Sequence, residues 1–304
     1  MIAKNHLIKK QLKMHGLNGN NVRFGNKIIR FIIDCYTREA GVRRLEQVVA
    51  SICRKCALKL EEEEISRISL TEENIKEFLG PPKFTNDEIG AEDLVGVVNG
   101  LAWTSVGGTL LQLEAITMPG SGKFELTGSL GDVMKESASI ALSFIRSVAH
   151  KYDIDADDFK NLDIHIHAPE GAVPKDGPSA GVTMATALLS AFTKRKVYRN
   201  IAMTGEISLT GRVMKIGGLK EKSMAAYKAG IKKIIIPKDN LSDLWEIDDV
   251  VKENVEFIGV SRVEEVFESA LQSFSNTTTE TSLRFSPKSK ANNFNTNRRK
   301  NDEI

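Results

Sequence analysis

The stretch Lys175-Asp176-Gly177-Pro178-Ser179-Ala180-Gly181 decides how the rest of this chain is interpreted. Small residues flank Ser179 on both sides, and an apolar run from Val182 to Phe192 follows at once. This pattern is typical of a nucleophile presented at the start of a buried helix, with Asp176 or Gly177 as the N-cap. The stretch therefore predicts a reactive serine in front of a buried helix.

A helix start of this kind also predicts where a negative charge is held. The backbone N–H groups of Ser179 and Ala180 would lack helix partners and would lie at the positive end of the helix dipole. We expect these two groups to form an oxyanion hole. The nucleophile and the donors that its chemistry needs would then come from one turn.

The segment Gly177-Pro178-Ser179-Ala180-Gly181 also fits the G-x-S-x-G nucleophile elbow of α/β-hydrolases, so that alternative has to be tested. Those enzymes place the acid and then the histidine after the serine. Every histidine of this chain comes before Ser179, at positions 6, 15, 150, 165 and 167. The order of residues therefore argues against an α/β-hydrolase.

Lysine is the candidate base that follows the serine. A lysine acts as a general base only if its pKa falls from about 10.4 to roughly 7–8, which costs on the order of 3–5 kcal/mol. A helix N-terminus contributes at most about 2 kcal/mol, so burial must cause most of this shift. Lys222 fits best, because it follows the Gly217-Gly218 turn among apolar neighbours, whereas Lys215, Lys220 and Lys228 have polar ones.

Three features together resemble the proteolytic domain of the Lon family of ATP-dependent proteases. They are Ser179 within Pro-Lys-Asp-Gly-Pro-Ser-Ala-Gly, the segment Thr204-Gly205-Glu206-Ile207, and Lys222, which lies 43 positions after the serine. The resemblance extends from about residue 2 to residue 271. It implies that Ser179 and Lys222 form a catalytic dyad and that Thr204 orients the lysine.

Four further residues match acidic and histidine positions close to the dyad in this family. The resemblance gives supporting roles to Asp176, His165, His167 and Glu114. Taken alone, Asp176 is a helix cap and Glu114 a solvent-facing strand residue. The two histidines share one face of a predicted strand, where they could also serve as the base for Ser179 or ligate a metal ion. No third ligand stands at a suggestive spacing, so we expect no metal site.

The order of predicted elements indicates the fold class and the domains. Residues 1–80 predict a small all-α domain, and residues 81–92 a linker that begins with two prolines. Residues 93–272 alternate strands and helices, which indicates an α/β or α+β fold and resembles the Lon proteolytic domain. Residues 273–304 are rich in Ser, Thr, Asn and Lys and predict a disordered tail.

The first strands of the proteolytic part contain several glycines. The stretch from Leu94 to Met118 predicts β-structure interrupted at Asn99-Gly100 and again at Gly107-Gly108. Gly120-Ser121-Gly122-Lys123 suggests a phosphate-binding loop, but Thr117 and Phe124 occupy positions where that motif needs Gly and Ser or Thr. We therefore expect a turn there, and no hydrolysis of ATP by this chain unaided.

A nucleotide contact is implied for the helical domain instead. The run from Tyr36 to Arg43 resembles the sensor-2 segment of the Lon ATPase module, in which Arg43 would contact the nucleotide phosphates. Judged by spacing alone, Arg43 is an exposed arginine at a helix start. The resemblance implies ATP and Mg for the full-length protein and no cofactor for peptide hydrolysis by this fragment.

Composition excludes several classes of protein. A net charge of +2 gives no support to binding of DNA, although that role is known in the family. Three cysteines argue against a disulfide scaffold, and Cys53 and Cys56 fall on the apolar stripe of a predicted helix, where packing explains them. No apolar run reaches the roughly 18 residues that a membrane span needs, so no membrane partner is expected.

These observations predict a Lon-type serine endopeptidase that hydrolyses unfolded or damaged proteins. The resemblance implies a homohexamer, dependence on ATP in the full-length protein, and a bacterial cytoplasm, with the mitochondrial matrix as the alternative. A catalytically silent oligomerisation scaffold is the alternative function. The presence of both Ser179 and Lys222 argues against that alternative.

Overall fold

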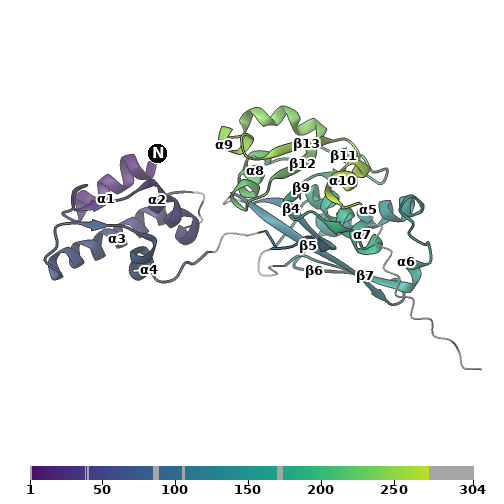
Figure 1. The fold of residues 1–304 in the computed structure, drawn as a ribbon, viewed down its shortest axis with the longest axis horizontal. Helices are drawn as coiled ribbons and strands as arrows, with labels where there is room; N and C mark the ends of the chain where they lie inside the picture. Colours follow the sequence, from purple (N-terminus) through teal and green to yellow (C-terminus); the bar gives the residue numbers. More distant parts are fainter. Residues whose placement is uncertain are drawn as a thin grey trace, which may run out of the picture. The chain divides into compact units, whose positions relative to one another are not determined.

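The structure is a computed structural model that describes residues 2–37, 39, 41–84, 89–104, 107–169 and 174–273. Residues 85–88 of the expected linker and 274–304 of the expected tail lie outside the described residues, so these expectations stay predictions. Figure 1 shows helices in the first part of the chain and a large sheet with helices in the rest. We call these two regions the helical part and the sheet part.

The helical part builds its own core from helices. Its elements are η1 (Ala3–Leu7), α1 (Ile8–Met14), β1 (Val22–Arg23), α2 (Asn26–Ile32), η2 (Ile33–Thr37), α3 (Arg43–Glu62), β2 (Ile68–Ser69) and α4 (Glu72–Leu79). The apolar core runs from Ala3 to Phe78 and includes Val49, Ile52 and Ile75. The only strands among the described residues of this part are β1 and β2, two residues each, so the expected helical fold of this part is confirmed.

Local signals set the ends of the last helix of this part. Thr71 precedes α4 and its hydroxyl accepts from Asn74 N, while the Asn74 side chain accepts from Thr71 N. This reciprocal pair satisfies two N–H groups that a helix start leaves free. Gly80 ends the helix with a φ of 83°, a conformation that suits glycine.

The cysteine pair of α3 belongs to the core. Cys53 and Cys56 are fully buried, and burial raises the pKa of the two thiols to about 11 and about 12. Thiols that stay protonated are poor nucleophiles and poor metal ligands. Packing therefore explains both side chains, as predicted.

The sheet part alternates strands and helices. Its elements are β3 (Leu94–Val95), β4 (Val97–Thr104), β5 (Gly107–Pro119), β6 (Phe124–Thr127), α5 (Asp132–Val148), η3 (Ala149–Tyr152), α6 (Asp158–Asn161), β7 (Leu162–His167), η4 (Pro178–Ala180), α7 (Gly181–Thr193), β8 (Lys196–Val197), β9 (Ile201–Met203), β10 (Glu206–Ile207), β11 (Val213–Met214), α8 (Leu219–Lys228), β12 (Lys233–Pro237), η5 (Lys238–Glu246), α9 (Asp249–Lys252), β13 (Glu256–Val260) and α10 (Val263–Ala270). The predicted fold class is confirmed.

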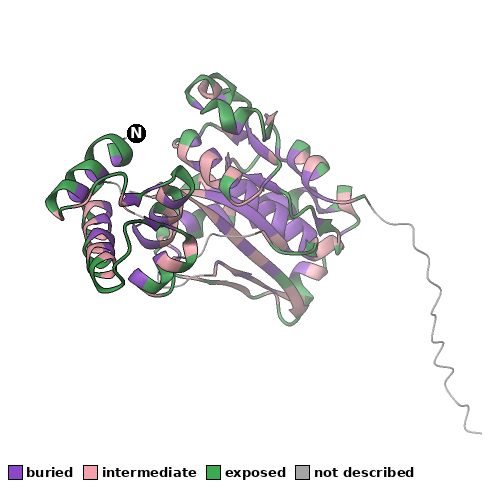
Figure 2. Cartoon of the chain, turned by 60° about the vertical axis from the view of Figure 1, so that its left-hand side comes forward, coloured by how far each residue is buried: buried purple, intermediate pink, exposed green. Residues whose placement is uncertain are grey.

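One mixed sheet of seven strands organises this part, in the order β13-β12-β9-β4-β5-β7-β6. Strands β13, β12, β9 and β4 run parallel, whereas β5 is antiparallel to β4 and to β7. The middle of the sheet is buried (Figure 2). A sheet buried in this way must be covered by helices on its faces.

The two faces of the sheet pack against different helices. In β12, Ile235 joins the apolar core that contains the side chains of α5 and α7. Its neighbours Ile234 and Ile236 point to the other face and pack with Leu219 and Ala226 of α8. The sheet therefore separates the α7 layer from the α8 layer.

The structure contradicts the interruption expected at Asn99-Gly100. β4 continues through both residues, and Gly100 lies where a Cβ would stand 2.9 Å from Thr183 Oγ1 of α7. The interruption expected at Gly107-Gly108 falls directly before these residues, because β4 ends at Thr104 and β5 begins at Gly107. Gly108 itself lies within β5, where a Cβ would stand 2.1 Å from Glu221 O of α8. Both glycines permit a helix to approach the sheet closely.

Replacement of Gly108 by alanine is expected to push α8 away from β5. The clash is with backbone, which cannot rotate away, so we expect a loss of about 2–3 kcal/mol in the free energy of unfolding, measured by urea denaturation. Gly90→Ala is the matched control, because a Cβ there has open space, and it should change the free energy by less than about 0.5 kcal/mol. Equal effects of the two substitutions would contradict this account of Gly108.

Candidate active site

Ser179 lies in the short 3-10 turn η4, directly in front of the buried helix α7. All residues from Gly181 to Ala191 are buried, as expected for the apolar run. Gly177 precedes the turn with a φ of 138°, which side chains other than glycine rarely adopt. Ser179 thus lies between a glycine in a conformation that suits glycine and a buried helix, close to the predicted arrangement.

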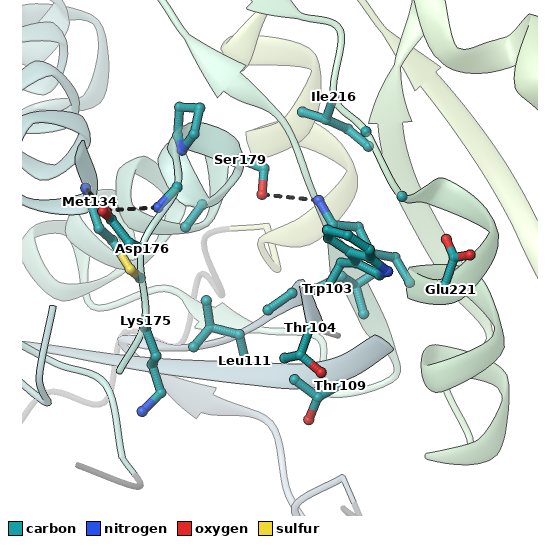
Figure 3. A pocket seen from close by; sticks show the side chains of 18 of the residues that line it. Trp103, Thr104, Thr109, Leu111, Met134, Lys175, Asp176, Ser179, Ile216 and Glu221 are labelled. Atoms are coloured by element: carbon teal, nitrogen blue, oxygen red, sulfur yellow. Dashed lines mark hydrogen bonds between the residues drawn. The ribbon is translucent and has the colours of Figure 1, made fainter. Parts of the chain in front are cut away.

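Asp176 does not cap the helix that follows it. Its Oδ1 atom accepts from Gly177 N at 3.0 Å and from Met134 N at 3.1 Å, in the first turn of α5 (Figure 3). The sequence predicted either Asp176 or Gly177 as the cap of the buried helix, but Ala180 is the N-cap of α7, and Gly177 is the N-cap of the short turn η4 in front of it. Asp176 instead satisfies an N–H group of another helix.

Lys222 reaches Ser179 from α8. Gly218 has a φ of 71° and starts this helix, whose fourth residue is Lys222. Lys222 Nζ lies 3.0 Å from Ser179 Oγ, an interaction drawn as a dashed line in Figure 3. The same Nζ lies 3.0 Å from Thr204 Oγ1. Two residues that are 43 positions apart are therefore in hydrogen-bond contact.

The Lys222 amine is withdrawn from solvent. The residue is only 3% exposed, and burial lowers its pKa from the ordinary 10.5 to about 8. A shift of this size corresponds to about 3 kcal/mol, within the range that the sequence argument required. Lys222 has no ion pair with any residue that the structure describes. Because Asp176 is bound to α5, it does not hold the amine in its charged form.

Thr204 joins the serine turn to the lysine. It follows β9 and is 1% exposed, and its Oγ1 lies 3.4 Å from Ser179 O. Backbone bonds fasten the same segment to the nucleophile turn, from Gly205 N to Ser179 O at 2.9 Å and from Val182 N to Gly205 O at 3.1 Å. Main-chain contacts therefore hold Ser179 and Thr204 next to each other.

A cavity of about 540 Å³ opens in front of the serine and the lysine. Side chains of Trp103, Leu111 and Met134 contribute to its wall, together with Asp176 and Ile216 (Figure 3). No local pattern points to Trp103, Leu111 or Met134 as cavity residues, because each is an ordinary strand or helix residue in the sequence. Their place in the wall follows from how β4, β5 and α5 come together.

The remaining predicted supporting residues are absent from this wall in the described structure. Glu114 lies on β5 and pairs with His167 on β7. Thr127 Oγ1 lies 2.8 Å from His165 Nε2 and 2.7 Å from His167 Nδ1, so one hydroxyl links both imidazoles. A supporting role for these three residues stays a prediction.

No group of three or more metal-ligating side chains occurs among the residues that the structure describes. Arg43 is the first residue of α3 and is exposed. Its contact with nucleotide phosphates stays a prediction. No helix within the described ranges combines the length and the apolar character needed to cross a membrane.

Comparison with known proteins identifies relatives of both parts. The family described as Lon protease (S16) C-terminal proteolytic domain matches residues 69–273, and the Lon protease AAA+ ATPase lid domain matches residues 13–68. A Lon protease of Clostridium acetobutylicum is 52% identical over 271 residues, which cover 89% of this chain and 35% of the relative. Lon protease 1 of Bacillus subtilis is 53% identical over 270 residues, with the same coverage of both chains. The chain thus spans about a third of the length of these curated relatives.

Replacement of Lys222 by methionine is expected to stabilise the fold at neutral pH. The pKa of Lys222 is about 8 in the folded chain and near 10.5 when unfolded, so between these values only the unfolded chain binds the proton. Stability is therefore lost as the pH falls from 10.5 to 8, and the full cost of about 3 kcal/mol persists below pH 8.

Urea denaturation of the wild type and Lys222→Met at pH 7 and pH 10 measures this cost. The variant should gain up to about 3 kcal/mol at pH 7 and much less at pH 10. Lys220→Met, at an exposed position of the same helix, should show neither effect. A gain that does not depend on pH would show that Lys222 is not desolvated.

Proposed function

Because the chain belongs to the Lon protease family, we propose that it is the proteolytic part of a serine endopeptidase in which Ser179 and Lys222 form the catalytic dyad. The observation that carries this proposal is the 3.0 Å distance between Lys222 Nζ and Ser179 Oγ, with the amine buried and its pKa lowered. A buried neutral amine in contact with a hydroxyl is a general base next to a nucleophile.

The proposed reaction begins with transfer of the Ser179 proton. The neutral Lys222 amine takes the proton from Oγ as that oxygen attacks the carbonyl carbon of a peptide bond. The ammonium then gives the proton to the leaving amine, and water hydrolyses the acyl-enzyme with Lys222 as base again. At pH 7 and a pKa of about 8, about a tenth of the amine is neutral, which is sufficient for a working base.

Thr204 is proposed to direct the lone pair of the lysine. Its hydroxyl donates toward Ser179 O, so its oxygen faces Lys222 Nζ as an acceptor. The neutral amine then donates to Thr204 and presents its lone pair to Ser179 Oγ. Thr204 is accordingly a positioning residue, and Ser179 fixes the orientation of its own base through its carbonyl group.

The oxyanion of the tetrahedral intermediate is proposed to be held by backbone N–H groups of Ser179 and Ala180. Both residues stand in η4, ahead of the first turn of α7. The helix dipole of α7 favours negative charge at this end. The same turn would therefore supply the nucleophile and part of the stabilisation of the transition state.

The part of β4 that extends beyond β9 is evidence that the substrate is a peptide. β9 pairs with β4 only at Asn99 and Gly100 in the described structure, whereas the stretch from Ala102 to Thr104 continues past it and lines the cavity. An extended peptide is able to pair with such a strand edge through its main chain. Main-chain pairing needs an unfolded segment, so we propose unfolded or damaged proteins as substrates.

For the longer protein we propose a homohexamer in the bacterial cytoplasm that uses ATP and Mg to deliver substrates. The match of residues 13–68 to a Lon lid domain supports this assignment. Arg43 would contact the nucleotide from that domain. We place the division between the domains at residues 81–92, because the apolar core of the helical part continues to Phe78 and the first strand of the sheet part begins at Leu94.

Substitution of either dyad residue is expected to abolish peptidase activity. Ser179→Ala removes the nucleophile, and Lys222→Arg replaces the base by a group that stays protonated, so each should lower kcat/KM for a fluorogenic peptide by at least about a thousandfold. Ser139→Ala, on the exposed side of α5, is the control and should keep activity within about twofold. Retention of full activity by Ser179→Ala or Lys222→Arg would disprove the dyad.

A further inference from the structure

A second cavity, of about 340 Å³, is separate from the cavity at Ser179. Its polar lining residues are Thr210, Arg212, Lys238, Asp239, Ser261 and Arg262. None of them lines the cavity at Ser179. The volume is within the range of small-molecule sites. Three of these side chains are cations and one is an acid, so the cavity presents an excess of positive charge to a ligand.

The topology of the large sheet brings residues of this cavity together. β12 and β13 are parallel neighbours that end side by side, because Pro237 pairs with Val260 (Figure 1). Lys238 directly follows β12, and Ser261 directly follows β13. In open α/β sheets, ligands bind in the crevice outside the carboxyl ends of the parallel strands. The cavity therefore lies where such a sheet commonly holds a ligand.

Two arginines of the cavity lie directly opposite each other. Arg212 and Arg262 form an isolated antiparallel bridge. Backbone hydrogen bonds of 2.9 Å flank this bridge, from Val213 N to Ser261 O and from Val263 N to Gly211 O. This pattern defines a non-hydrogen-bonded pair, in which the two Cα atoms are about 4.5 Å apart and the side chains lie on the same side. Like charges at such a pair repel each other, and an anion bound between them would remove the repulsion.

Carboxylates of the described residues compensate these cations only in part. The side chains of Arg212 and Lys238 have no ion pair in the part of the chain that the structure describes. Arg262 Nε lies 3.4 Å from Glu264 Oε2, and Asp239 is the acid in the cavity lining. Three cations thus face two carboxylates, and positive charge remains for a ligand.

We propose that this cavity binds a phosphate group. The guanidinium groups of Arg212 and Arg262 are planar forks that bind phosphate oxygens in pairs, and Lys238 adds a third charge. The hydroxyls of Thr210 and Ser261 line the same cavity and are able to donate to further oxygens. A phosphate group carries a charge of about −1.5 to −2 at pH 7, so it balances these cations better than a carboxylate does. The group belongs to free inorganic phosphate or to a phosphorylated side chain.

A bound phosphate group would join two segments of the sheet part. Arg212 lies in the hairpin between β10 and β11, whereas Lys238 and Arg262 follow strands of the large sheet. Arg262 Nη2 already donates to Thr210 O of this hairpin at 2.9 Å. A ligand held by all three cations would add to this link. Hydrogen exchange of the hairpin amides, such as Gly211 N, which donates to Ser208 O, should therefore slow when phosphate binds.

An NMR titration of the full 304-residue chain with inorganic phosphate at constant ionic strength tests the proposal. The amides of residues 210–213 and 261–262 should show saturable shifts. Arg212→Gln should raise the dissociation constant for phosphate at least about tenfold, because it removes one fork. The Arg212 side chain has no hydrogen bond or ion pair within the described residues, so the variant should keep the fold, which thermal melting checks.

Lys238→Gln and Lys232→Gln are a matched pair, because the two exposed lysines flank opposite ends of β12. Lys238→Gln should raise the dissociation constant at least about threefold, and Lys232→Gln should leave it within about 1.5-fold of the wild type. Shifts that do not saturate by about 50 mM phosphate would overturn the proposal. So would an unchanged dissociation constant in Arg212→Gln, or equal effects of the two lysine variants.

A second titration, with a short peptide that contains one phosphoserine and with its unphosphorylated form, identifies the source of the phosphate group. A dissociation constant at least about tenfold lower for the phosphopeptide than for inorganic phosphate assigns the site to phosphorylated side chains. A smaller difference assigns it to free phosphate. Saturable binding of the unphosphorylated peptide at the same amides with equal affinity would contradict a phosphate site.

Discussion

The removal of water from the Lys222 amine is the condition on which the candidate site depends. A charged ammonium next to Ser179 would be unable to accept a proton, and only burial lowers the pKa of Lys222 in this structure. The fold achieves this by close packing, since Gly108 lets α8 approach β5 at the residue before Lys222. The helix that carries Lys222 therefore lies close to the sheet because Gly108 on the neighbouring strand has no side chain.

Main-chain hydrogen bonds position Ser179 and Thr204 relative to each other. Ser179, Thr204 and Lys222 come from three separate elements, and hydrogen bonds of Gly205 tie two of these elements together. Asp176, the acid nearest to the serine in the sequence, is bound to the first turn of α5 and leaves the amine without a carboxylate partner. Among the residues that the structure describes, the amine therefore has no carboxylate partner that would favour its protonated form.

The fold class and the contact between Ser179 and Lys222 could be predicted from the sequence because their signals are local. Ser179 stands among small residues before an apolar run, and Lys222 follows a glycine turn. Gly100 was misinterpreted as a break, because a glycine that permits close packing has the same sequence signal as one in a turn. The place of Trp103 in the cavity wall and the role of Asp176 as a cap for α5 depend on contacts between distant segments, which no local pattern encodes.

The central claim is that burial lowers the pKa of Lys222 to about 8, which leaves a working fraction of its amine neutral near physiological pH. An NMR titration of isotope-labelled lysine side chains tests this claim most directly. The signal of Lys222 is the one that disappears in Lys222→Met. The account predicts a midpoint near pH 8 for this signal, well below those of the exposed lysines. A midpoint near 10.5 would show an ordinary solvated ammonium and contradict the account.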